Sequence, residues 1–182
     1  MLFRSAVTTT INGGYGNGQV VPGAGFLLNN EMDDFTARPG QPNSAGLVTG
    51  TTNAIAPGKR MLSSMTPTIV VKDGRNWLVT GSPGSGMIIS TVLQTIVNMI
   101  DFGMNVQQAV DAPRMHHQWQ PDVLLLEKPG FPADVVDALE ARGHKTRTVE
   151  AIGEAHAIAI DPATGIRLGA ADPRGAGAAL GY

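Results

Sequence analysis

The chain has 182 residues, of which 42% are hydrophobic and 15% charged, and its formal net charge is 13 − 15 = −2. This length and composition suit one globular domain with a hydrophobic core and exclude a disordered chain. The slightly acidic balance argues against a nucleic-acid partner held by bulk charge, because such binding needs a basic face. Cysteine is absent, which excludes disulfides, thiolate metal sites and a cysteine nucleophile.

The first half of the chain is predicted to be a strand followed mainly by loops. Residues 6–11 are rich in Val and Thr, as strands are, and they lead into a glycine-rich loop over 12–18. A short apolar segment follows at 25–28. Prolines and small residues mark 36–60 as a long surface loop, and long ordered loops in compact domains often serve as lids over sites.

Regular elements are predicted in the second half. Apolar runs on either side of Asp73-Gly74 predict a β-hairpin over 68–80, which leads into a glycine-rich loop at 81–86. Apolar residues then recur at helical spacing up to Ile100, and Gly103 suits the position after a helix end. Further elements are predicted in chain order: a short helix capped by Asn105 and Gln108 and ended by Pro113, a strand at 123–126, a helix at 132–142 and a hairpin of 157–160 with 166–169.

This alternation of hairpins and helices predicts an α+β fold with largely antiparallel sheets. No stretch is apolar and long enough to span a membrane, since the best candidate, 87–100, is interrupted by polar residues. Residues 1–5 are too short to be a signal peptide.

The strand, glycine-rich loop and helix over 77–100 form the most informative local pattern. The N–H groups at a helix start are unpaired and the helix dipole favours negative charge there, so loop 81–86 suits a phosphate, a carboxylate or a developing oxyanion. It is not a P-loop, because no Gly-Lys-Ser/Thr follows, and its glycines lack the dinucleotide-binding spacing. Taken alone, the pattern also suits an ordinary tight turn, so both interpretations stay open.

Acidic residues next to one another at Asp33-Asp34, beside Glu31, suit an amine, a metal ion or simply a solvated turn. No His or further carboxylate follows at ligand spacing, so neither a metal site nor a cofactor is predicted. The serine pair Ser63-Ser64, near Lys59-Arg60, suits a carboxylate, although such pairs are common in loops.

The histidines are predicted to be structural. Adjacent side chains point to different sides, so His116-His117 is a poor chelating pair and is expected to contribute packing. His144 and His156 stand alone, and neither a nucleophile elbow nor a Ser/His/Asp set is present.

Several segments resemble, in order and over nearly the whole chain, the small subunit of γ-glutamyltransferases. These are 12–18, 25–35 (GFLLNNEMDDF), 59–71 (KRMLSSMTPTIVV), 78–84 (LVTGSPG), 111–119 (DAPRMHHQW) and the ending 169–182 with its Asp172-Pro173-Arg174. The resemblance implies an N-terminal-nucleophile hydrolase, an α+β protein in which two β-sheets pack between helical layers (an αββα sandwich). The chain would be its C-terminal, small-subunit part, a single domain over 1–182.

The activity implied is γ-glutamyl transfer or hydrolysis. A precursor cleaves itself, and the new N-terminal threonine attacks γ-glutamyl amides such as glutathione. The acyl group then passes from the threonine to water, an amino acid or a peptide. The α-amine of such a nucleophile can act as its base. The implied partner is the large subunit of the same precursor, which supplies an arginine for the substrate carboxylate, and the implied location is periplasmic or secreted.

The segment that begins with the nucleophilic threonine has no counterpart here. Residues 1–5 do not resemble it, and Thr8 and Thr9 are not at a chain end. We therefore expect an N-terminally truncated fragment that is inactive alone.

The resemblance assigns roles to individual residues. Thr10 supports the nucleophile; Asn12, Glu31 and Asp34 hold the substrate α-amino group; Ser63 and Ser64 bind its α-carboxylate; Gly84 and Ser85 form the oxyanion hole. Two positions depart from the family: Ser85 stands where a glycine is usual, and Ala45 where some relatives carry a lid tyrosine.

Two alternatives remain. One is a relative with shifted specificity, a glutaryl-amide (cephalosporin) acylase, although a glutaryl group has no α-amine for Asn12, Glu31 and Asp34 to hold. The other is a non-catalytic fragment that acts only as a partner of a large subunit.

Overall fold

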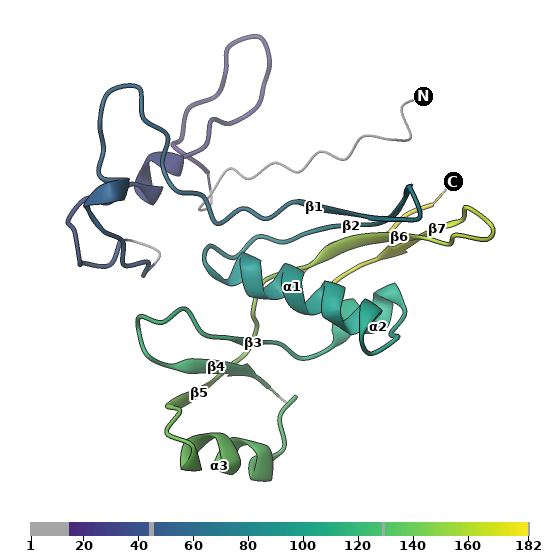
Figure 1. Ribbon diagram of the computed structural model, residues 1–182. Coiled ribbons are helices and arrows are strands. Elements are labelled where there is room, and N and C mark those ends of the chain that lie inside the picture. The colour runs from purple at the N-terminus through teal and green to yellow at the C-terminus, as the bar shows by residue number, and fades with distance from the viewer. Residues whose placement is uncertain (1–14, 44–45, 129, 182) are drawn as a thin grey trace. The chain divides into compact units, whose positions relative to one another are not determined.

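The computed structural model describes residues 15–43, 46–128 and 130–181, so the predicted strand at 6–11 lies outside the described residues. The described residues group into two compact units that divide between Ser63 and Ser64. The single domain expected from the sequence stays a prediction. Figure 1 shows the order of the elements along the chain. Each unit is taken by itself below.

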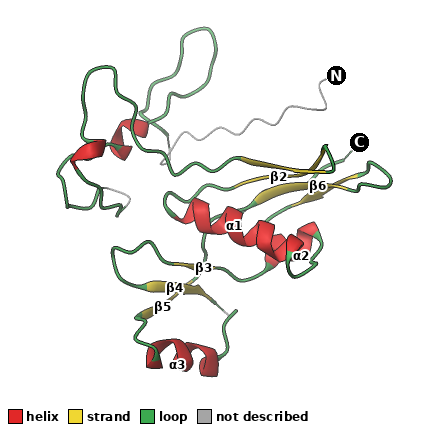
Figure 2. Cartoon of the chain, viewed as in Figure 1, coloured by secondary structure: helices red, strands yellow, loops and turns green. Residues whose placement is uncertain are grey.

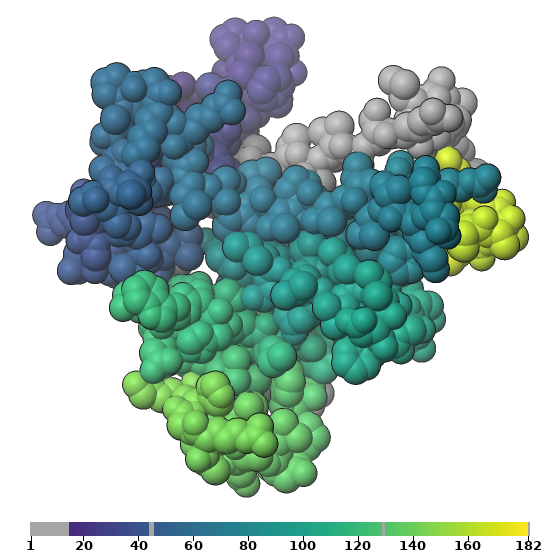
Figure 3. Space-filling view, viewed as in Figure 1, coloured from purple at the N-terminus to yellow at the C-terminus, as the bar shows by residue number. Residues whose placement is uncertain are grey.

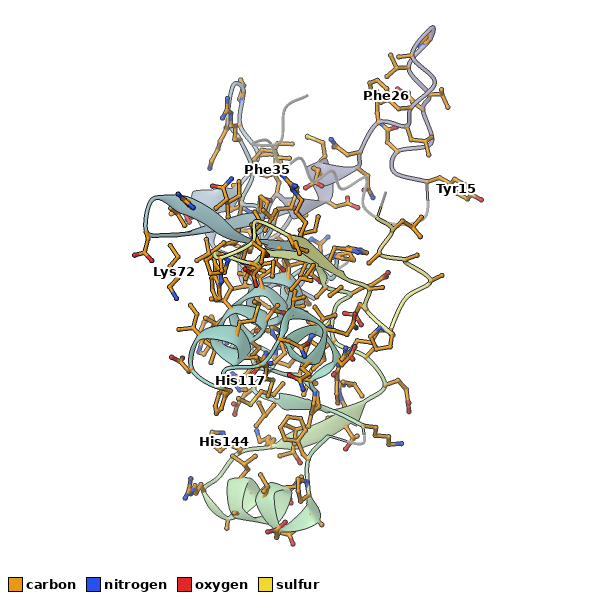
Figure 4. All side chains as sticks on the ribbon, turned by 90° about the vertical axis from the view of Figure 1, so that its right-hand side faces the viewer. Tyr15, Phe26, Phe35, Lys72, His117 and His144 are labelled. Atoms are coloured by element: carbon orange, nitrogen blue, oxygen red, sulfur yellow. The ribbon has the colours of Figure 1, made fainter. Side chains whose placement is uncertain are left out.

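The unit that ends at Ser63 is mostly loop (Figure 2). Its described residues include two short 3-10 helices, η1 (Glu31–Asp34) and η2 (Thr51–Asn53). Before η1, an isolated antiparallel bridge joins Val20 to Leu27, and the chain around this bridge is solvent-exposed. Figure 4 shows Tyr15 and Phe26 extending from this region, and their side chains are 79% and 58% exposed.

The expected long loop is ordered by its own backbone. Thr36 lies two residues after the end of η1, and Asn53 is the last residue of η2. The N–H of Thr36 donates to the carbonyl of Asn53 at 2.9 Å. Gly40 N–H donates to Thr49 O at 3.1 Å, and an isolated bridge pairs Pro42 with Val48. These bonds make 36–53 a closed loop whose two ends meet at one point.

The second unit contains a four-stranded antiparallel sheet in the order β1 (Thr68–Lys72), β2 (Arg75–Gly81), β6 (His156–Ile160) and β7 (Arg167–Ala170). Both predicted hairpins, β1–β2 and β6–β7, are confirmed. At the first turn Asp73 and Gly74 have φ values of 50° and 73°, the left-handed pair that an Asp-Gly hairpin turn requires.

Two helices, α1 (Met87–Ile100) and α2 (Val106–Asp111), cover one face of this sheet (Figure 1). Leu78 of β2 is fully buried in a cluster that includes Val106 and Val110 of α2. Within α1, the buried residues Ile88, Thr91, Val92 and Thr95 recur at helical spacing. The predicted capping box at Asn105 and Gln108 is present and starts α2.

A smaller sheet completes this unit, in the order β3 (Met115–His116), β4 (Leu124–Glu127) and β5 (Thr146–Val149). β3 pairs with β4 antiparallel, but β4 pairs with β5 parallel, so the expectation of largely antiparallel sheets has an exception here. Helix α3 (Ala133–Ala141) makes the crossover between β4 and β5, as a parallel pair requires. No residue of α3 is buried, and its segment forms the lower end of the surface in Figure 3.

No helix among the described residues has the length and apolarity needed to cross a bilayer.

Candidate active-site residues

The loop between β2 and α1 contains the two predicted oxyanion-hole residues. β2 ends at Gly81 and α1 begins at Met87, so the predicted strand–loop–helix arrangement is confirmed. The carbonyls of Gly84 and Ser85 accept from Met87 and Ile88 N–H at 3.0 and 3.1 Å, which forms the first helical turn. Within the described part of the chain, the N–H groups of Gly84 and Ser85 donate to no acceptor. They therefore remain available to a ligand.

The backbone of this loop has left-handed values at both positions. Gly84 has a φ of 129°, and Ser85 has a φ of 53°. A serine in this region carries steric strain that a glycine would not, of about 1 kcal/mol. Ser85 thus keeps a backbone N–H and carries strain that a glycine at this position would not.

A segment distant in sequence supports this loop. A Cβ built on Gly84 would lie 3.3 Å from the Cα of Gly153, so the two glycines are in close backbone contact. Ser82 Oγ accepts from Glu154 N–H at 3.0 Å and donates to Pro83 O at 2.6 Å. Sequence reasoning missed this segment, because its residues follow no periodicity and form no motif.

The supporting segment is itself held by buried charges. Arg114 Nη1 donates to Ile152 O at 2.9 Å, and the Ile152 N–H donates to Glu127 Oε1. Arg114 pairs with Asp172 at 2.8 Å, and Arg174 pairs with Glu127 at 2.6 Å. Two cations and two anions cancel in charge, which allows them to be buried together.

The pKa values in this charge network reflect burial and pairing. Burial would raise the pKa of Asp172, but the N–H of Arg174, the guanidinium of Arg114 and the N–H of Ala155 hold that pKa below its ordinary value. Burial lowers the pKa of Arg114, against the opposing effect of Asp172. Burial also acts to lower the pKa of Arg174, but its bonds to Glu127 and Asp172 raise it overall.

The predicted amine-binding carboxylates lie together on η1. Glu31 is 7% exposed, and burial, followed by the hydrogen bond and the charge of Asp34, raises its pKa above the ordinary value of 4.5. Glu31 Oε1 is buried and has no hydrogen-bond partner among the described residues. An unsatisfied, buried carboxylate oxygen beside a second carboxylate is suited to a cation with N–H donors.

A metal ion is not favoured at this position. Among the residues that the structure describes, no group of three His, Cys, Asp or Glu side chains is arranged to hold one.

The predicted serine pair falls at the division between the two units. Ser63 is exposed and Ser64 is half-buried, and Ser64 O accepts from Thr66 Oγ1 at 2.9 Å. The nearby Lys59 ammonium donates to the carbonyls of Thr52 and Ala54, so its charge orders the chain locally.

The structure therefore brings only some of the predicted residues together. Glu31, Asp34 and Ser63 share one unit, whereas Ser64, Gly84 and Ser85 belong to the other. Thr10, Asn12 and Ala45 lie outside the described residues.

The expected packing role of the histidine pair is confirmed for His116. It is 5% exposed, its Nδ1 lies 2.8 Å from Ser90 Oγ on α1, and its Nε2 lies 3.0 Å from Gln118 Oε1. His117 instead reaches Asp122 at the surface, at 3.2 Å. The pair thus points to two different environments.

Comparison with known proteins gives consistent matches. The family model described as Gamma-glutamyltranspeptidase matches residues 5–182. The glutathione hydrolase proenzyme of Escherichia coli (strain K12) is 57% identical over 169 residues, which are 93% of this chain and 29% of that protein. The chain thus spans about three tenths of the length of this curated relative.

Solved structures agree with this match. A γ-glutamyltranspeptidase mutant from Helicobacter pylori has a TM-score of 0.86 and 53% identity, over 93% of this chain and 92% of that one. The cephalosporin acylase of Bacillus halodurans has a TM-score of 0.72 and 34% identity, over 88% of this chain and 28% of that one. The predicted α+β, N-terminal-nucleophile hydrolase-like fold is confirmed by these neighbours. The family match over nearly the whole chain shows that this protein belongs to the γ-glutamyltranspeptidase family.

Proposed function

We propose that this chain supplies the small-subunit part of an enzyme that transfers the γ-glutamyl group of glutathione and other γ-glutamyl amides to water, amino acids or peptides. The observation that carries the proposal is the buried Glu31 carboxyl group beside Asp34, whose Oε1 has no hydrogen-bond partner among the described residues. A γ-glutamyl group carries a fixed α-ammonium, and an ammonium held away from water needs carboxylate partners.

The proposed reaction begins with the hydroxyl of the N-terminal threonine of a processed small subunit. The hydroxyl oxygen adds to the γ-carbonyl carbon while its proton passes to the threonine α-amine. The resulting oxyanion accepts from the N–H groups of Gly84 and Ser85, and such donors contribute roughly 10²–10³ in rate. As the intermediate collapses, the threonine α-ammonium returns this proton to the leaving nitrogen, the C–N bond breaks and the amine departs. A γ-glutamyl ester remains, which water or an acceptor amine then cleaves.

The remaining predicted residues have supporting roles in this proposal. Asn12 joins Glu31 and Asp34 at the α-ammonium, Ser63 and Ser64 bind the α-carboxylate, and Thr10 supports the threonine hydroxyl. The glutaryl-amide acylase alternative would leave the carboxylate pair on η1 without a ligand.

We further propose that a large subunit of the same precursor is the partner of this chain. The four-stranded sheet of this chain has an apolar outward face, on which the side chains of Ile69, Val71 and Ile158 are 45%, 57% and 46% exposed. Exposed apolar surface of this kind is typical of interaction sites. The E. coli relative is a proenzyme about three times as long as the region matched. A periplasmic or secreted location is proposed on the same family grounds.

The test uses a chimeric precursor, the E. coli proenzyme in which the matched segment is replaced by this chain. Asp34→Ala is expected to raise KM for glutathione by roughly two orders of magnitude, because a buried ammonium loses its partner. Folding and self-cleavage should survive, and both are checked by the appearance of two subunits on a gel.

Two controls accompany this variant. A glutaryl amide keeps the carboxylate but lacks the α-amine, so Asp34→Ala should change its KM little. Asp33→Ala removes an exposed carboxylate from the same 3-10 helix and should leave both donors unaffected. Equal losses on both donors, or blocked self-cleavage, would show that Asp34 is structural.

A further inference from the structure

Asn53 lies at the centre of the unit that contains the proposed amine site. It is 8% exposed and uses both ends of its side-chain amide. Its Nδ2 donates to the carbonyl of Asp34 at 2.6 Å, and its Oδ1 accepts from the N–H of Leu62 at 2.8 Å. One buried side chain therefore joins η1 to the residue immediately before Ser63.

This connection matters because of what the two segments are proposed to bind. In a γ-glutamyl group the ammonium and the carboxylate are attached to the same carbon, so their separation is fixed. A site that holds both groups must keep its own two segments at a matching separation. We infer that Asn53 is a positioning residue that sets the distance between Asp34 and Ser63; this inference rests on the function proposed above.

The main chain of Asn53 has a separate role. Its carbonyl accepts from Thr36 N–H at 2.9 Å and its N–H donates to Gly50 O at 3.2 Å, and these bonds close loop 36–53. Neither bond involves the side chain. A substitution at Asn53 can therefore release the two segments while the base of the loop keeps its backbone bonds.

Two variants of the chimeric precursor separate the two side-chain bonds. Asn53→Asp keeps an oxygen to accept from Leu62 N–H but loses the donor to Asp34 O, so only the Asp34 side is released. Asn53→Ala loses both bonds. We expect Asn53→Asp to raise KM for a γ-glutamyl anilide roughly tenfold and to spare a glutaryl anilide, whereas Asn53→Ala raises KM for both donors.

The kcat values should change little, because interactions made equally in the ground state and the transition state affect KM alone. Hydrogen exchange at the Leu62 amide gives a readout that does not depend on activity. Exchange should become faster in Asn53→Ala and stay slow in Asn53→Asp.

Asn43 provides the matched control. Its side chain makes the same kind of bridge between two other residues, with Nδ2 donating to Asp33 O at 3.1 Å and Oδ1 accepting from Leu47 N–H at 2.9 Å. Asn43→Ala should keep KM within about twofold of the parent and leave Leu62 exchange unchanged.

Three results would overturn the inference. These are unchanged KM in both Asn53 variants, an equal loss on both donors in Asn53→Asp, or unchanged Leu62 exchange in Asn53→Ala. If Asn53→Ala fails to fold, the KM values of Asn53→Asp for the two donors still test the inference. A parent chimera that self-cleaves but acts on no γ-glutamyl amide would refute the proposed function instead, and Leu62 exchange would still decide whether Asn53 ties the two segments.

Discussion

Glu31 is a carboxyl group in surroundings that disfavour its charge. Burial and the neighbouring Asp34 raise its pKa, and one of its oxygens is buried without a partner among the described residues. A bound ammonium would reverse both effects, because it would supply a donor and an opposite charge. The free protein therefore keeps a site that is electrostatically unfavourable until it is occupied.

The raised pKa of Glu31 predicts how stability depends on pH. The folded state binds this proton more tightly than the unfolded state, so the contribution of Glu31 is fully present below the ordinary value of 4.5 and is lost as pH rises through the raised folded value. Glu31→Gln, which cannot ionise, should lack this loss. In thermal unfolding of the chimeric precursor, the Tm of Glu31→Gln relative to that of the parent should increase as pH rises from 4.5 to neutrality.

Excess γ-glutamyl ligand should remove this increase in relative Tm, since the ammonium of the ligand favours the charged form of Glu31. The same pH series with Asp33→Asn, at an exposed position of η1, should follow the parent throughout. A constant difference between the parent and Glu31→Gln across the series would contradict the assignment.

At this scale the residue types could be taken from the sequence, but the states of the side chains could not. The resemblance of the NNEMDDF segment pairs Glu31 with Asp34 at the α-ammonium, and this assignment stays a prediction. That Glu31 is buried with an unsatisfied oxygen depends on how η1 packs, and packing is not encoded in local spacing. Similarly, the identity of Ser85 was visible, but its φ of 53° was not.

Among the elements, the oxyanion loop depends on a contact between glycines. Gly84 lies against Gly153, and Gly153 in turn lies against the side chains of Ser82 and Thr91. A Cβ at Gly153 would meet Thr91 Oγ1 and would lie 2.7 Å from Ser82 Oγ. The absence of a side chain at Gly153 thus determines how closely the supporting segment approaches the loop.

Gly153→Ala is predicted to displace the oxyanion loop. Its φ of 66° adds strain to the clash, and the two together should cost roughly 2–4 kcal/mol in unfolding free energy. The kcat of the chimeric precursor should fall by at least about tenfold, with KM less affected, since an oxyanion hole acts in the transition state.

Gly103→Ala is a closely matched comparison. Gly103 has a φ of 65°, but a Cβ there would meet nothing within 4 Å, so this variant carries the strain without the clash. Gly103→Ala should lower the unfolding free energy by only about 1 kcal/mol and leave kcat unchanged. Equal effects on kcat from the two alanines would mean that the contact with Gly84 does not position the loop.

Elements with a strong local signal were predicted correctly, whereas short elements without one were missed. The two hairpins and α1 follow from turn residues and apolar spacing, which act over a few residues. β5 was missed because its four residues, Thr-Arg-Thr-Val, are short and polar, and its partner β4 reaches it only through the α3 crossover. The supporting segment at 152–154 has no regular structure of its own to predict.

At the scale of the larger unit, three buried charges and the partly buried Arg174 connect segments from four parts of the sequence. Glu127 is bonded by Arg114 N–H, by Ile152 N–H and by the guanidinium of Arg174. Asp172 is bonded by Arg114 and by Ala155 N–H. The network joins both sheets of this unit and fixes the segment that supports the oxyanion loop.

Asp172→Asn is predicted to destabilise the protein strongly. It preserves shape but leaves two buried arginines with one anion, and removing one partner of a buried ion pair costs about 3–5 kcal/mol. In thermal unfolding of the chimeric precursor, the Tm of Asp172→Asn should be much lower than that of the parent. Glu150→Gln removes an exposed pair, with Lys128 at 3.6 Å, and should cost less than about 1 kcal/mol. Losses of similar size would mean that the buried pair contributes no more than a surface one.

The same network also constrains the order in which the unit can fold. Arg114 and Asp172 are separated by 58 positions, and Arg174 bonds Val110 across 64. During synthesis, Arg114 emerges 58 residues before Asp172, its ion-pair partner, so a compact intermediate formed early would have to bury a cation without that partner. Consolidation of the network therefore waits for Asp172 and Arg174. Contacts this distant in sequence also make folding slow, so the oxyanion loop gains its support only at the end of folding.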